Sequence, residues 1–182
     1  MRRMLEYLLF VDTVTSFSLG LLGPIYAIFV EGIGGDILSA SSVWAAYTIV
    51  IGLMIILFGK LEDRIRREGK VMTFGYILIS ISTLGYYFVS NPLELLLVQI
   101  VLGIGVAIIT PSFDTLYCKY LEKKKVGFEW GLWEGLGEIF TGAAAIAGGL
   151  IATFFGFKLL FIIMFLVSLA SVIVSVKEFS LK

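Results

Sequence analysis

Four acidic side chains lie within apolar stretches of the chain, and none has a Lys or Arg at comparable depth. They are Asp12, Asp114, Glu134 and Glu138. If these stretches cross a membrane, each ionised carboxylate near the bilayer centre costs roughly 2.5 to 3.5 kcal/mol on insertion scales. We therefore expect the four to face the protein interior or a wet cavity, where carboxylates bind and release protons or cations.

Glu134 and Glu138 are four residues apart, which places two like charges side by side on one helix. Their repulsion favours proton binding by one of the pair, and a carboxylate that gains and loses a proton can carry it across a membrane. Two alternatives stay open. In one, the pair binds a cation; in the other, it is structural, and is solvated near the surface or paired with Lys123–Lys125.

Asp12 is the stronger single candidate for a functional charge. It lies about six residues inside its apolar run, roughly 9 Å at 1.5 Å per residue, on one helical face with Thr15 and Ser16. The alternative is an interfacial carboxylate near Arg2 or Arg3. We expect a proton- or substrate-binding set made of Asp12, Gln99, Glu134 and Glu138.

The elements that position these residues are membrane spans. Of 182 residues, 59% are hydrophobic and 15% charged, against about 45–50% and 25% in soluble domains, which argues against a water-soluble domain. The apolar runs have the length of spanning helices, lack the alternation of barrel strands and lie at about 6–30, 41–59, 71–90, 93–117, 131–154 and 158–176. The sequence predicts an all-α membrane protein with six transmembrane helices.

The basic residues fall almost entirely on one side of these spans. All but Lys158 of the 14 Lys and Arg lie in the N-terminus, the second and fourth breaks, or the tail. The positive-inside rule then places both termini in the cytoplasm, at the cytoplasmic membrane, and makes any dimer parallel. With one cysteine, Cys118, and no His, we expect no internal disulfide, no metal site and no cofactor.

The chain can be laid on itself with an offset of 87 residues, so that Asp12 meets Gln99 and Pro24 meets Pro111. This predicts one six-helix domain over 1–182, built from repeats at about 6–90 and 93–177. The repeats begin on opposite sides of the membrane, as in many secondary transporters. Pro24 and Pro111 interrupt corresponding helices and point to a binding region, unless they are the prolines common in membrane helices.

The break between the second and third runs resembles the loop signature of the major facilitator superfamily. The matching residues are Gly59, Leu61, Asp63, Arg64 and Arg67, while Arg66 stands where the family has its second Gly. The fourth run is similar to the family pattern Arg-x-x-x-Gly-x-Gly-x-Ala at Gly103, Gly105 and Ala107, with Gln99 in place of the Arg. The Gly-rich fifth run, 142–149, also resembles its counterpart.

The resemblance implies an N-terminal-half-like unit in which the first, second, fourth and fifth helices bound a cavity. It also implies that the loop Asp and Arg make charge contacts that hold an inner gate shut, with Asp114 as the candidate partner. A plain topology-determining loop explains the basic residues equally well. Family members usually have two six-helix halves related by an axis along the membrane normal, and a parallel homodimer would reproduce that arrangement.

We therefore expect a proton-coupled secondary transporter that moves a small solute by alternating access as a half-transporter homodimer, not an enzyme or a nucleic-acid-binding protein. A cationic or amphipathic neutral substrate fits the acidic cavity, and Tyr26, Trp44 and Tyr47 could line an apolar pocket for it. The alternatives are a non-transporting scaffold and an accessory half that pairs with a separate partner. The short polar tail 177–182 contains no linker, which favours a complete product.

Overall fold

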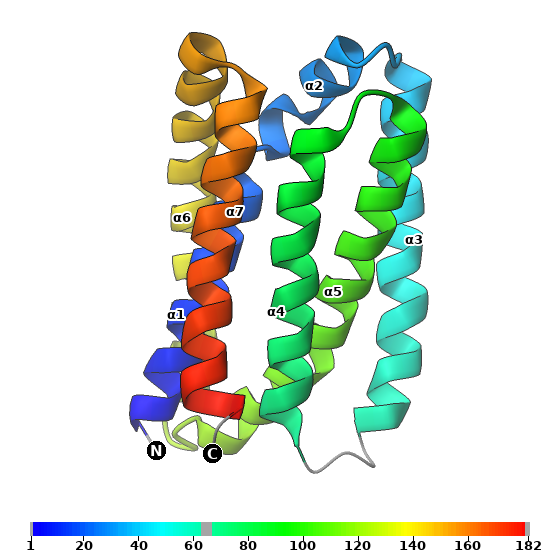
Figure 1. Ribbon diagram of the computed structural model, residues 1–182. Helices are drawn as coiled ribbons and strands as arrows, with labels where there is room; N and C mark the ends of the chain where they lie inside the picture. The colour runs from blue at the N-terminus through cyan, green and yellow to red at the C-terminus, as the bar shows by residue number, and fades with distance from the viewer. Residues whose placement is uncertain (1, 63–66, 181–182) are drawn as a thin grey trace.

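Six long apolar helices run side by side along one axis in the computed structural model, which describes residues 2–62 and 67–180 (Figure 1). The first span is broken into α1 (Arg2–Gly20), the 3-10 turn η1 (Gly23–Ile25) and α2 (Tyr26–Gly32). The others are α3 (Ile37–Glu62), α4 (Glu68–Gly85) with η2 (Tyr86–Phe88), α5 (Pro92–Tyr120), α6 (Val126–Phe155), and α7 (Phe157–Ser175) with η3 (Val176–Ser180). The predicted six-helix, all-α fold is confirmed, and all six are long and apolar enough to cross a membrane.

Both termini lie at one end of the bundle, together with the end of α3, the start of α4 and the connection between α5 and α6 (Figure 1). At the opposite end, short polar segments start the next helix. Asp36 precedes α3 and its Oδ1 accepts hydrogen bonds from Ser39 N at 2.7 Å and Ser39 Oγ at 2.6 Å. These bonds hold the pKa of Asp36 below its usual range. Asn91 Oδ1 caps α5 in the same way, by accepting from the backbone of Leu93 and Glu94.

The helix contacts follow a two-fold pattern. α1 packs on α6 and α7, α5 packs on α3 and α4, and α4 meets α7. Exchanging the first, second and third spans with the fourth, fifth and sixth leaves this set of contacts unchanged, as inverted three-helix repeats require. The boundaries of the two repeats stay a prediction.

Buried hydroxyl groups join α7 to its two neighbours. Thr15 of α1 donates to Ser171 at 3.0 Å, and hydroxyl pairs link α4 to α7 at 2.7 Å and 2.9 Å. The pairs are Thr73–Ser175 and Thr83–Ser168. Hydrogen bonds between membrane helices contribute about 0.6 kcal/mol each on average. The three bonds therefore stabilise the packing of α7 against α1 and α4.

Glycines allow the closest helix crossings. A Cβ on Gly148 of α6 would collide with the carbonyl group of Leu21, and a Cβ on Gly75 of α4 would lie 2.8 Å from the carbonyl oxygen of Gly105 in α5. The backbones therefore touch where α6 meets the end of α1 and where α4 meets α5. Such close approach is typical of membrane helix packing.

The two predicted proline interruptions differ. The first span does break beside Pro24, which sits in η1. The break expected at Pro111 is absent, because α5 continues from Pro92 to Tyr120 with Pro111 inside it. Membrane helices accommodate a single proline through local adjustment and neighbouring hydroxyl groups, and Thr110 Oγ1 donates to Val106 O at 3.0 Å beside it.

Candidate functional site

The first candidate site is a cavity of about 180 Å³ between α1, α4, α5 and α6, which we call the Asp12 chamber. The helical spacing of Asp12, Thr15, Ser16 and Leu19 turns these α1 side chains toward one face. The remaining walls come from the other three helices: Tyr76, Ile79, Val106, Ile109, Thr110, Phe113, Asp114 and Trp133.

Asp12 is held by the indole of Trp133. Trp133 Nε1 donates to Asp12 Oδ2 at 2.6 Å, which joins α1 to α6 across the chamber. The Trp133 ring also packs against Phe113 of α5, with 5.0 Å between ring centroids. A charge-assisted bond of this length fixes the direction of the carboxylate.

Asp114 lines the same chamber, close enough to Asp12 for the two carboxylates to interact electrostatically. None of the described lining residues is basic. Both lie roughly 9 to 15 Å along their helices from the end that carries the termini. Two like charges in a confined space favour the uptake of one proton or one cation, because either relieves their repulsion.

A second, smaller cavity of about 70 Å³ lies farther along the same faces of α1 and α5, and we call it the Gln99 chamber. It is lined by Tyr26, Trp44 and Tyr47, as the sequence suggested. The centroid of the Trp44 ring lies 5.6 Å from that of Tyr26 and 5.4 Å from that of Tyr47. Leu19 lines both chambers. The other lining residues are Leu22, Gly23, Tyr86, Gln99, Leu102 and Met164.

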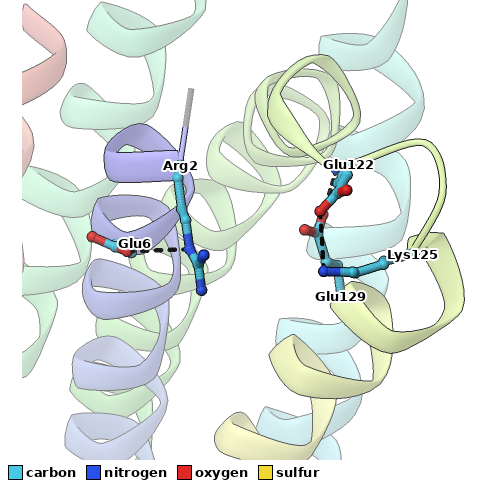
Figure 2. Close-up of polar contacts among 5 residues, drawn as sticks. All are labelled: Arg2, Glu6, Glu122, Lys125 and Glu129. Atoms are coloured by element: carbon cyan, nitrogen blue, oxygen red, sulfur yellow. Dashed lines mark hydrogen bonds and ion pairs between the residues drawn. The ribbon is translucent and has the colours of Figure 1, made fainter.

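Basic side chains near the N-terminal ends of α1 and α6 pair with acids other than Asp12, Glu134 and Glu138 (Figure 2). Arg2 pairs with Glu6 at 3.9 Å and Lys125 with Glu122 at 3.5 Å, both on the exposed surface. Arg3 donates to the Tyr7 hydroxyl group. Asp12 is therefore not paired with the N-terminal arginines; its hydrogen bond goes to Trp133.

Glu134 and Glu138 do not face the interior of this bundle, which corrects our expectation. Both are exposed on α6, and among the described residues neither forms a hydrogen bond or an ion pair. The side of α6 that packs inward carries Trp130, Trp133, Ala144 and Gly148.

The loop motif is only partly described. Asp63 and Arg64 lie outside the described residues. Gly59 and Leu61 lie in the last turn of α3, and Arg67 is exposed just before α4. Asp114, the expected partner, lines the Asp12 chamber instead, and forms no ion pair with Arg67. The role of the motif in gating stays a prediction.

Sequence reasoning missed two residues. The first is Trp133, the partner of Asp12. The only sequence signal that could have found it is the helical spacing of positions 130, 133, 144 and 148, which places them on one side of α6. Glu62 is buried at the end of α3, and its Oε2 accepts a hydrogen bond from Ser112 Oγ of α5 at 2.9 Å. The family motif includes the neighbouring Asp63 and does not include Glu62.

Comparisons with known proteins agree with the fold. The family model described as Major Facilitator Superfamily matches residues 8–179. An uncharacterized MFS-type transporter of Methanocaldococcus jannaschii is 27% identical over 161 residues, which cover 86% of this chain and 42% of that protein. The multidrug resistance protein MdtG of Serratia proteamaculans is 24% identical over 92% of this chain and 42% of its own length.

A third relative is the multidrug resistance protein MdtG of Salmonella typhimurium, 25% identical over 84% of this chain and 39% of its own length. The chain thus spans about two fifths of the length of the curated relatives it matches.

Proposed function

Because the chain belongs to the major facilitator superfamily, we propose that it is a secondary active transporter that moves a small solute across the cytoplasmic membrane by alternating access. The observation that carries this proposal is the Asp12 chamber. Two carboxylates from α1 and α5, the equivalent first helices of the two repeats, share a confined cavity inside a membrane-spanning bundle. Intramembrane acids of this kind mark ion and substrate pathways.

Proton coupling would run through Asp12. When Asp12 is ionised, Trp133 Nε1–H donates to it and stabilises its charge. A proton taken up by Asp12 or Asp114 removes the repulsion between them, and a cationic substrate would do the same in its place. Exchange of a proton for a cation at this chamber would link the two fluxes.

The substrate we favour is cationic or amphipathic and neutral. The acidic groups and the aromatic walls of Trp133, Phe113 and Tyr76 suit an organic cation. The curated relatives named multidrug resistance proteins are compatible with such a substrate.

The inner gate would lie where α3 meets α5. There, Ser112 donates to the buried Glu62, directly before Asp63 and Arg64 of the motif. Breaking this contact in one state would shift the balance between conformations. Both termini and this gate would then be on the cytoplasmic side, as the basic residues predict.

We also propose that the unit works as a parallel homodimer. Only 6% of α3 and 11% of α6 are buried in the most apolar window of each helix, against 50% for the first and third spans. The exposed Glu134 and Glu138 lie roughly 12 and 18 Å from the start of α6, too deep to be left against lipid. A second copy, or a separate partner half, would cover them.

The test is flux in liposomes that contain the purified chain. A pH gradient should drive the movement of a cationic dye such as ethidium, and a neutral sugar should not move. If no cation or amphipathic compound of a broad panel moves with or without a gradient, the chain is a scaffold or needs a partner half. Adding candidate partner halves to the same liposomes separates these two outcomes.

A further inference from the structure

The Gln99 chamber has a different chemistry from the Asp12 chamber. None of the described residues that line it is charged. Its walls are the rings of Tyr26, Trp44, Tyr47 and Tyr86 together with aliphatic side chains, and its polar groups are an amide and phenol hydroxyl groups. Among these described residues, no charged side chain is therefore available to pair with a ligand.

Gln99 is 1% exposed, and its amide lies close to the phenol of Tyr26. Within the part of the chain that the structure describes, Gln99 Oε1 and the Tyr26 hydroxyl oxygen have no hydrogen-bond partner within 3.5 Å, although the Gln99 side chain is near enough to interact with the Tyr26 phenol. Buried polar groups are almost always bonded, and unbonded ones occur where a ligand or water completes them. The two atoms come from α1–α2 and α5, the helices that also supply Asp12 and Asp114.

We propose that the Gln99 chamber is a binding subsite for a neutral group that carries a hydrogen-bond donor, such as an alcohol, a phenol or an amide. The donor bonds to Gln99 Oε1, and the Tyr26 hydroxyl group donates to the same ligand's oxygen. The apolar part of the ligand packs against the aromatic walls. A buried carbonyl oxygen has given up its hydrogen bonds to water. It therefore discriminates strongly against a ligand that offers no hydrogen-bond donor.

The chamber is small for a whole drug-sized molecule, because typical ligand pockets measure about 300 to 1,000 Å³. It holds one polar group with part of a ring. Along the α1 and α5 axes, Tyr26 and Gln99 lie roughly 20 Å from Asp12 and Asp114, and Leu19 lines both chambers. A ligand would therefore occupy the two chambers in succession, and Leu19 would be the side chain that moves aside.

This succession rests on the proposed function; binding in the Gln99 chamber does not. The test is ligand-observed ¹⁹F NMR of 4-fluorophenol and 4-fluorotoluene, a pair that differs by one hydroxyl group, with the protein in nanodiscs. Empty nanodiscs at the same lipid concentration give the partitioning background. The variants are Gln99→Leu and Tyr26→Phe, with Tyr87→Phe as the matched control, because it removes a phenol oxygen that lines neither chamber.

We expect 4-fluorophenol to bind the wild type more tightly than 4-fluorotoluene, and Gln99→Leu to weaken it by about 3- to 10-fold, the effect of one hydrogen bond. 4-Fluorotoluene should bind Gln99→Leu at least as well as the wild type. Tyr26→Phe should weaken the binding of 4-fluorophenol alone, and Tyr87→Phe should change the binding of neither probe.

Equal binding of both probes to the wild type, or unchanged binding of 4-fluorophenol in both variants, would overturn the inference and leave a cavity that holds water only. If Gln99→Leu abolishes the binding of both probes, the result for Tyr26→Phe decides the question, since this substitution removes one oxygen and keeps the shape of the side chain. Flux without this binding would refute the subsite alone. Binding without flux would refute the proposed function alone.

Discussion

Asp12 on α1 and Trp133 on α6 are joined by a hydrogen bond of 2.6 Å from the indole nitrogen to a carboxylate oxygen. The bond connects two helices from different repeats at the chamber where we place the exchange of proton and substrate. It also explains why the carboxylate has a fixed direction although no basic residue of the described chain lines the chamber.

Trp133→Phe removes this donor and keeps an aromatic ring against Phe113. Hydrogen bonds to charged groups contribute about 1.5 to 3 kcal/mol, so we expect pH-driven flux of a cationic dye to fall by about tenfold or more. Trp130→Phe is the control, because Trp130 packs in the same aromatic group without bonding Asp12. Equal loss in the two variants would mean that ring packing, not the hydrogen bond, matters.

Gly148→Ala should destabilise the bundle by about 1 to 3 kcal/mol, the usual range for overpacking. Its Cβ would collide with the Leu21 carbonyl group where α6 crosses the end of α1. The neighbouring Gly149→Ala meets no atom within 4 Å and should be neutral or slightly stabilising. Thermal unfolding in detergent measures both, and equal melting temperatures would show that the crossing tolerates a methyl group.

The cap at Asp36 should make stability depend on pH. Hydrogen bonds from Ser39 lower the pKa of Asp36, so the cap stabilises the fold above the ordinary aspartate pKa of about 3.9 and is lost as the pH falls through the lowered value. We expect Asp36→Asn, compared with the wild type, to lower the melting temperature at neutral pH. The difference should vanish in strong acid; a constant difference would argue against the carboxylate.

The proposed homodimer would place α6 at the interface and the outer face of α7 toward lipid. With Cys118 replaced by Ser, a cysteine at Ile139 of α6 should form a disulfide-linked dimer under mild oxidation. A cysteine at Ile173 of α7 is the control, since the two side chains are 68% and 60% exposed. Native mass spectrometry in mild detergent should show the dimer, and monomer alone would contradict it.

The span positions, the fold and the lining role of Tyr26, Trp44 and Tyr47 followed from the sequence, because apolar length and aromatic clustering are local properties. The inward face of α6 did not. Its small residues at 142, 145 and 149 suggest a face as readily as those at 144 and 148, and only contact with Leu21 distinguishes the two sets.

The chemistry of the chamber depended on pairing across helices. Asp12 stood out as a charge in an apolar run, whereas Trp133 lies 121 positions away and looks like any other interfacial aromatic residue. Asp114 was expected to face the interior or a cavity, and the family resemblance also made it the candidate partner of the loop motif. Its helical face, shared with Thr110 and Phe113, directs it into the chamber.

The most direct test of the proton-coupled exchange is the flux of a cationic dye in liposomes under an imposed pH gradient, for the wild type, Asp12→Asn and Glu6→Gln. Glu6 is an exposed acid on the same helix, outside the Asp12 chamber, and serves as the control. We predict flux that depends on the gradient for the wild type and Glu6→Gln, and no dependence on the gradient for Asp12→Asn. Unchanged gradient-driven flux in Asp12→Asn would contradict the account.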